Sequence, residues 1–300
     1  MSPAAMRRLA KPMLLTATVI WGASFVFTKN ALDALPWSYL VAIRFTVGTP
    51  LLVLAAGRRW RRFTPDYLWR GGIAGLLLYL TYWGQTVGLT MTTPSKNAFL
   101  TAVYCVLVPF FAWAVTRRRP DRYNVSAAVL CVVGIGLVSL SERLTINAGD
   151  LLTLVGAVFC AANLVAVSHL GQGKDVMLLT VVQFACTALC CWLTGLCTAS
   201  FPARALTRPE VFWPLAYLCI LATAVGLMLQ NIGIVWCEPA AAAVLLSLES
   251  VFGVLFSVIL YGDPITPRLL TGFVFIFTAV VCSETKFSFL RKKSQKALPK

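Results

Sequence analysis

Charged residues are scarce in this sequence, and acidic residues are the scarcest. Asp, Glu, Lys and Arg make up 12% of the 300 residues, whereas soluble domains carry about 25%. Hydrophobic residues make up 59% and the mean hydropathy is +0.80, so too few polar side chains are present to cover a globule in water. This balance argues against a soluble enzyme, and the wealth of apolar residues argues against intrinsic disorder.

The sequence motifs of metal-binding, ATP-driven and disulfide-rich proteins are also missing. The single histidine, His169, excludes a multi-histidine metal site, and no GxxxxGK[ST] segment is present to bind ATP. Ten cysteines lie in or beside apolar runs without a CxxC pair, which is typical of small buried side chains rather than disulfides. We therefore expect no metal, no cofactor and no catalytic residues.

The sequence instead contains ten long apolar runs. A hydrocarbon core of about 30 Å needs about 20 apolar residues per helix, and these continuous runs lack the alternation of membrane β-strands. We predict an all-α integral membrane protein with ten transmembrane helices. The expected spans are 13–32, 37–56, 70–90, 96–116, 124–141, 149–169, 176–198, 211–235, 239–261 and 266–283.

The basic residues predict how these helices are oriented. Lys and Arg number 26 against 11 acidic residues, a net charge of +15 that in a soluble protein would suggest nucleic acid. Between the expected helices, however, 19 basic residues fall on the side of the N-terminus and 5 on the other, while Lys29 and Arg44 fall inside helices. By the positive-inside rule both termini are cytoplasmic. Because orientation accounts for the charge, we expect no nucleic-acid partner.

The two halves of the chain resemble each other at fixed offsets. Segment 85–94 recurs at 230–239 with Gln, Gly and Pro in register 145 positions apart, and segment 42–45 matches 181–184 at an offset of 139. Each half holds five helices, an odd number, so the copies must insert in opposite orientations as an inverted repeat, which suits alternating access. We expect one five-helix repeat over 12–141, a second over 149–284, and a basic cytoplasmic tail over 285–300.

Five segments carry a resemblance to a known family. They are Trp21–Phe25 with Lys29, Ile43–Phe45, Gly88–Pro109, Ser247–Ser250 and Tyr261–Thr266. Together they resemble the drug/metabolite transporter superfamily, specifically its EamA-type ten-helix transporters, over essentially the whole chain. Asp263 stands where that family usually has Glu. The resemblance implies two EamA-like repeats and secondary transport of a metabolite, and it does not identify the cargo.

Charged side chains inside apolar runs are candidate functional residues, because each costs at least about 2.5–3.5 kcal/mol at the bilayer centre. Glu249 is the only carboxylate well inside a run; apolar surroundings favour its neutral form, so it is a candidate for proton coupling. Arg44 can clamp a carboxylate or phosphate of the cargo, and Lys29 is a second coupling candidate. The alternatives are structural: Glu249 can be a neutral or hydrogen-bonded structural residue, and Arg44 can hydrogen-bond to neighbouring carbonyls or snorkel. Lys29, near the outer end of its helix, can snorkel.

Aromatic and polar residues on the expected helices are candidates for the wall of a substrate cavity. The alternative is that they pack or hydrogen-bond between helices. The predicted substrate-binding residues are Trp21, Ser24, Arg44, Tyr79, Tyr82, Gln85, Tyr104 and Gln230, with Asn97, Asn163, Gln183 and Asn231 as further polar candidates. Pro109 is expected to kink its helix.

Taken together, these patterns predict a secondary active transporter that exports a small polar metabolite, such as an amino acid, by alternating access, with a proton as the candidate coupling ion. The alternatives are an integral-membrane transferase or other membrane enzyme, and a nucleotide-sugar or phosphate-ester exchanger of the same superfamily. We expect a multi-pass protein of the plasma membrane (the inner membrane of a bacterium). Its expected partners are the small-molecule substrate and the lipid bilayer, and both a monomer and a homodimer stay open.

Overall fold

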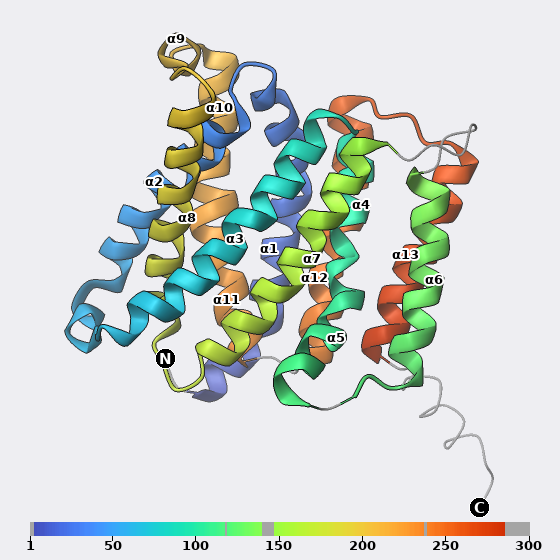
Figure 1. Cartoon of the computed structure of the whole chain (residues 1–300), viewed down its shortest axis with the longest axis horizontal. Helices are drawn as coiled ribbons and strands as arrows, with labels where there is room; N and C mark the ends of the chain where they lie inside the picture. The colour runs from blue at the N-terminus through green and yellow to red at the C-terminus, as the bar shows by residue number, and fades with distance from the viewer. Residues whose placement is uncertain (1–2, 118, 140–146, 237–238, 286–300) are drawn as a thin grey trace, which may run out of the picture.

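The computed structural model describes residues 3–117, 119–139, 147–236 and 239–285, which form a bundle of helices without strands (Figure 1). Residues 286–300 of the expected tail, together with Arg118, Arg143 and Cys237, lie outside the described residues. The first half of the bundle contains α1 (Pro3–Leu32), α2 (Trp37–Ala56), the 3₁₀ helix η1 (Gly57–Arg62), α3 (Asp66–Thr90), α4 (Pro94–Ala102), α5 (Tyr104–Thr116) and α6 (Arg122–Ser139). The second half contains α7 (Ala148–Leu170), α8 (Val176–Thr198), α9 (Ala203–Leu206), α10 (Pro209–Tyr217), the π-helical η2 (Leu218–Gly226), α11 (Leu227–Trp236), α12 (Pro239–Phe256), the π-helical η3 (Ser257–Tyr261) and α13 (Pro267–Thr285).

Each expected span lies on one of these helices or on consecutive ones. Three spans are divided: α4 and α5 form the fourth, α10, η2 and α11 the eighth, and α12 with η3 the ninth. The fourth breaks at Val103, and α5 continues through Pro109 as helix. The segments long and apolar enough to cross a membrane are Arg8–Leu32, Trp37–Arg62, Pro94–Thr116, Ala148–Leu170, Val176–Thr198 and Pro209–Ile234, with shorter apolar helices at Arg122–Ile135, Leu245–Tyr261 and Pro267–Cys282. The number of ten crossings therefore stays a prediction.

Polar side chains set where two of the helices begin. Asn147 precedes α7 and accepts a hydrogen bond from the Gly149 N–H at 2.7 Å. Asp175 precedes α8 and accepts one from the Met177 N–H at 3.1 Å. Such caps satisfy N–H groups that have no partner in the first turn. Each cap therefore marks the end of a connecting segment and the start of the next apolar helix.

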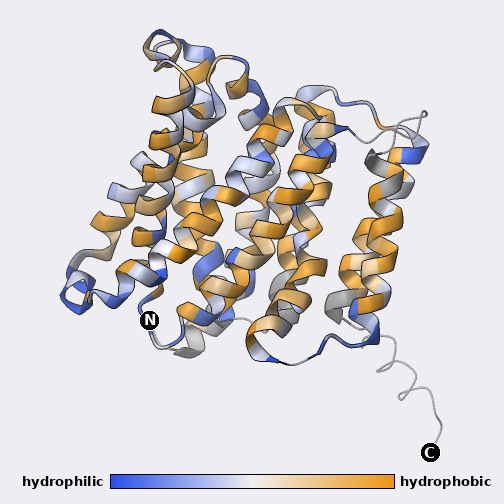
Figure 2. Ribbon diagram, viewed as in Figure 1, coloured by the Kyte–Doolittle hydropathy of each residue, from blue (hydrophilic) through white to orange (hydrophobic). Residues whose placement is uncertain are grey.

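The outer surface of the bundle is apolar. Leu54, Leu196 and Trp213 are 77%, 69% and 70% exposed, respectively. Hydrophobic segments run along most helices, and the most hydrophilic segments gather mainly near the helix ends (Figure 2). A soluble monomer rarely exposes apolar patches of this extent. The surface instead matches the hydrocarbon core of a bilayer, with the polar residues at the level of the head groups.

The helices pack in pairs that bring the two halves together: α3 against α7, α1 against α12, α2 against α8, and α6 against α13. At the crossing of α3 and α7, a Cβ atom on Gly84 would lie 2.6 Å from the Gly156 nitrogen, and one on Gly156 would lie 2.7 Å from the Gln85 nitrogen. Glycine is required at both positions because the backbones touch, as is common where membrane helices associate.

Gly156→Ala is expected to lower the thermal stability of the purified protein in detergent. The new methyl group would press on the α3 backbone at Gln85, and overpacking of this kind costs about 1–3 kcal/mol. Gly72→Ala, on the same helix pair, is the matched control because nothing lies within 4 Å of its added Cβ. Equal melting temperatures for the two variants would contradict the close crossing.

The start of α1 and the end of α13 lie at the same end of the bundle (Figure 1). We call this the terminal end; η1 and the end of α7 lie there too. The opposite end carries the connection from η3 to α13, which includes Asp263, and we call it the Asp263 end.

Candidate functional site

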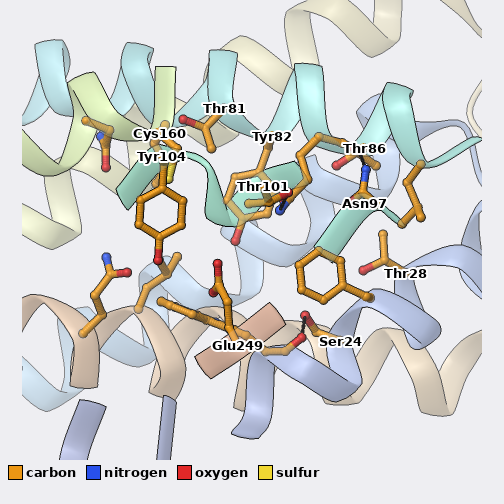
Figure 3. A pocket seen from close by; sticks show the side chains of 18 of the residues that line it. Ser24, Thr28, Thr81, Tyr82, Thr86, Asn97, Thr101, Tyr104, Cys160 and Glu249 are labelled. Atoms are coloured by element: carbon orange, nitrogen blue, oxygen red, sulfur yellow. Dashed lines mark hydrogen bonds between the residues drawn. The ribbon is translucent and has the colours of Figure 1, made fainter. Parts of the chain in front are cut away.

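A cavity of about 80 Å³ lies in the middle of the bundle (Figure 3). A single buried water needs about 10–15 Å³ of such space, so the cavity holds several waters or one small solute. We call it the central cavity. The described residues that line it are Trp21, Ser24, Phe25, Thr28, Arg44, Leu78, Thr81, Tyr82, Gln85, Thr86, Leu89, Asn97, Thr101, Tyr104, Cys160, Asn163, Leu164, Leu227, Gln230 and Glu249.

Most residues predicted from the sequence to bind the cargo line this cavity. Tyr79 does not: its hydroxyl lies 2.8 Å from the Thr194 hydroxyl on α8, so it joins two helices instead. Lys29 also lies outside the cavity wall. Of the residues predicted for substrate binding or coupling, those that line the central cavity are Trp21, Ser24, Arg44, Tyr82, Gln85, Tyr104, Gln230 and Glu249.

Several polar wall residues were not predicted, mainly threonines. Thr28 lies seven residues after Trp21 and four after Ser24, so all three share one face of α1. On α4 and α5, Thr101 lies three residues before Tyr104. These residues could have been predicted from their helical spacing, because each lies three, four or seven residues from a predicted residue on the same face. The missed wall residues with polar or thiol side chains are Thr28, Thr81, Thr86, Thr101 and Cys160.

The wall of the cavity repeats itself between the two halves of the chain. Applying the offsets of 139 and 145 to wall residues of the first half leads to other wall residues in the second. A solute in this cavity would therefore contact equivalent positions of both copies. The related pairs are Trp21 with Cys160, Ser24 with Asn163, Phe25 with Leu164, Tyr82 with Leu227, Gln85 with Gln230, and Tyr104 with Glu249.

Arg44 brings a positive charge to the cavity from α2. The residue is 3% exposed; its Nε donates a hydrogen bond to the Thr223 hydroxyl at 3.0 Å, and its Nη2 donates one to the Tyr82 hydroxyl at 3.3 Å. The guanidinium carbon lies 4.9 Å from the centre of the Tyr82 ring. In the described part of the chain Arg44 forms no salt bridge. Its charge is therefore held in place by neutral groups and stays available to an anionic group of a solute.

Glu249 brings a carboxyl group to the cavity from α12. The residue is 5% exposed, and Tyr104 directs its hydroxyl toward the carboxyl group (Figure 3). Among the described residues Glu249 has no salt-bridge partner either. A buried carboxyl group that faces hydroxyls and a solute space can accept a proton or a cationic group of the solute.

Polar contacts join the helices to one another at the Asp263 end of the bundle. The Lys29 ammonium donates hydrogen bonds to the backbone carbonyls of Leu89 at 2.7 Å, Thr92 at 3.0 Å and Thr90 at 3.3 Å. These carbonyls end α3, where a cation is favoured by the helix dipole. Lys29 therefore fastens α1 to the end of α3.

Two aspartates extend these contacts to the other helices. Asp263 accepts hydrogen bonds from the Ser257 hydroxyl at 2.9 Å, from the Ser95 N–H at 3.2 Å and from the Ser95 hydroxyl. Asp150 accepts one from the Thr92 hydroxyl at 2.5 Å, and its other oxygen lies 3.8 Å from the Lys96 ammonium. The contacts join α4 to η3 and to α7.

A second cavity, of about 280 Å³, leads from the region of the central cavity toward the terminal end. It lies between α5, α7, α11 and α12, and we call it the vestibule. Tyr104 and Leu164 line both cavities. The other described wall residues are Cys105, Val108, Ala112, Val115, Thr116, Val165, Ser168, His169, Gln172, Ile234 and Leu246.

Comparison with known proteins places this arrangement in a family. A family model described as the EamA-like transporter family matches residues 9–140 and again 147–285. An "Uncharacterized transporter" of Archaeoglobus fulgidus is 33% identical over 274 residues, which cover 89% of this chain and 83% of that protein. The "Uncharacterized transporter YvbV" of Bacillus subtilis is 24% identical over 290 residues, covering 95% and 93%.

The fold is shared with a solved structure as well. A protein described only as a crystal structure has a TM-score of 0.69 and 17% identity, covering 94% of this chain and 98% of its own. The resemblance inferred from the sequence motifs is confirmed by the two family matches and by the relatives, and the apolar spans agree with it. The chain is a multi-pass membrane transporter and belongs to the EamA-like transporter family.

Proposed function

We propose that this protein is a secondary active transporter that exports a small zwitterionic metabolite, such as an amino acid, by proton-coupled alternating access. The observation that carries the proposal is the central cavity, where Arg44 and Glu249 face one solute-sized space without salt-bridge partners among the described residues. Arg44 suits a carboxylate, while Glu249 suits an ammonium group or a proton. A zwitterion would supply both missing partners at once.

The size of the cavity favours a small cargo. About 80 Å³ suits a solute of a few heavy atoms and is too small for a nucleotide sugar. A phosphate ester of similar size stays the second candidate, because a guanidinium binds phosphate as well as carboxylate. A membrane enzyme would need an acid or base near water, yet Asp150 and Asp263 are buried and engaged in contacts that join helices.

Alternating access is supported by the asymmetry between the two ends of the bundle. At the Asp263 end the helices are joined by Lys29, Asp150 and Asp263, whereas the terminal end contains the vestibule. In an inverted repeat, exchange of conformations between the copies would open the first end and close the second. We assign the terminal end to the cytoplasm because η1 places four arginines there, which the positive-inside rule favours. In a bacterium the membrane would be the inner membrane.

The test is a panel of solutes offered to the purified protein in proteoliposomes, with and without a pH gradient. Counterflow of amino acids but not of phosphate esters is expected, with accumulation when the gradient is imposed. Liposomes without protein provide the background. Counterflow of phosphate esters alone would favour the second candidate, and absence of any solute movement would contradict the transport proposal.

A further inference from the structure

Only two side chains of the described wall belong to both the central cavity and the vestibule. Tyr104 is 3% exposed and begins α5, directly after the break in the helix at Val103. Leu164, on α7, is the other. These two side chains therefore lie where the two spaces adjoin, and Tyr104 directly follows the break between α4 and α5 at Val103.

Tyr104 and Glu249 occupy equivalent places in the two copies of the repeat. They are 145 positions apart, the same offset that relates Gln85 to Gln230. In the structure they come together at the centre of the bundle, where the Tyr104 hydroxyl is directed at the Glu249 carboxyl group (Figure 3). This contact therefore joins the two copies at the position that each contributes to the central cavity.

The repeat also shows where the opposite passage would lie. Subtracting 139 from Ser168, a vestibule residue, gives Lys29, and subtracting 145 from Ile234 gives Leu89. In the vestibule these positions line an open space, whereas Lys29 and the Leu89 carbonyl are hydrogen-bonded at 2.7 Å. The terminal end therefore contains an open vestibule, while the equivalent residues of the Asp263 end are hydrogen-bonded to each other. By the same offset, Glu249 has the place toward the Asp263 end that Tyr104 has at the vestibule.

We propose that Tyr104 and Glu249 form a reciprocal gate. Tyr104 closes the central cavity toward the vestibule, and the Glu249 carboxylate holds it there by accepting a hydrogen bond from its hydroxyl. A proton that binds Glu249 removes the charged acceptor and releases Tyr104, so the passage opens. The inference rests on the proposed function, since it gives the coupling proton a structural effect on access to the cavity.

The groups that face Glu249 allow this contact to act as a gate. Tyr82 on α3, Tyr104 on α5, Cys160 on α7 and Arg44 on α2 surround the same space. Tyr82 is engaged by the Arg44 guanidinium, and Cys160 is a weak hydrogen-bond donor. Tyr104 is thus the hydroxyl placed both at Glu249 and at the passage. It acts as a positioning residue, through Glu249 rather than through the cargo.

Cys160 provides a native reporter, because it lines the central cavity but not the vestibule. A membrane-impermeant methanethiosulfonate is added from the terminal end, and modification of Cys160 is followed by peptide mass spectrometry at pH 7.5. No cargo is needed. Tyr104→Phe should raise the rate about tenfold, the effect expected for losing a hydrogen bond to a charged group. Glu249→Gln replaces the charged acceptor with a neutral amide oxygen and should raise the rate by a smaller factor. The double variant should be no faster than the faster single variant, because both changes act on the same contact.

Three controls make the result specific. Tyr79→Phe removes a hydroxyl that bonds Thr194 away from both cavities, and should leave the Cys160 rate unchanged. Ser168→Cys places a thiol in the wall of the vestibule and should react quickly in every background. This reaction shows that the reagent reaches the vestibule. Cys160→Ser should remove the signal.

Unchanged Cys160 modification in Tyr104→Phe, with rapid modification at position 168, would overturn the gate even if transport is observed. Additive effects of the two substitutions would overturn the claim that they act through one contact. Accelerated modification in a protein that moves no solute would instead refute the proposed function and leave the gate standing.

Discussion

Glu249→Gln is expected to abolish accumulation of cargo driven by a pH gradient while exchange of cargo across the same liposomes continues. Glutamine preserves the size of the side chain and its ability to face Tyr104, but it neither binds nor releases a proton in the physiological range. Net transport against a gradient requires a proton to move with each cycle. Exchange requires only that the loaded transporter change its access, so it survives.

The measurement compares two assays on one preparation: uptake after a pH jump, and counterflow at equal pH on both sides. In the variant, uptake should fall to the level seen without a gradient. Glu210→Gln is the matched control because it makes the same chemical change at an exposed residue of α10. Full gradient-driven uptake by Glu249→Gln would show that the coupling proton binds elsewhere, and loss of both assays would indicate a structural role for Glu249.

The helices could be predicted from the sequence because a bilayer imposes a length and a composition on each crossing. The start and end of α8, for example, are those expected from its apolar run at 176–198. The break at Val103 could not be predicted in the same way. Proline is the local signal for a kink, but no proline lies at Val103: Pro109 lies six residues further on, within α5. At this break α4 packs against α7 and α12, and no local sequence pattern records such contacts.

The candidate site shows the same division between composition and packing. Arg44 and Glu249 could be singled out because a buried charge is costly wherever it lies in a bilayer. Tyr79 and Tyr82 are three residues apart on one helix, and only the positions of α8 and α2 decide which of them faces the cavity. The sequence identifies Lys29 as a charged residue inside an apolar run, but it does not show that the side chain binds backbone carbonyls at the end of α3.

Arg44→Gln is expected to raise the concentration of amino acid needed for half-maximal counterflow by about 10- to 100-fold. The reason is that a charge-assisted hydrogen bond to a buried carboxylate is worth about 1.5–3 kcal/mol, and each 1.4 kcal/mol is about tenfold in affinity. Glutamine is also the residue that the second copy carries at the equivalent position, Gln183, 139 residues later. Gln183 is accommodated in a buried site there, so we expect the variant to fold.

Arg44→Lys separates charge from geometry, because lysine keeps the positive charge but lacks the planar fork of donors. We expect it to fall between wild type and Arg44→Gln. Arg58→Gln, at an exposed position of η1, is the control for loss of an arginine.

The decisive comparison is between an amino acid and the amine that lacks its carboxylate. If Arg44 reads the carboxylate, Arg44→Gln should weaken counterflow of the amino acid and leave that of the amine unchanged, because only the amino acid loses a partner. If Arg44 instead positions Thr223 and Tyr82, both solutes should weaken together, since both use the same wall. Equal losses for the two solutes would therefore assign Arg44 to the architecture of the cavity and remove the main reason for proposing an anionic group on the cargo.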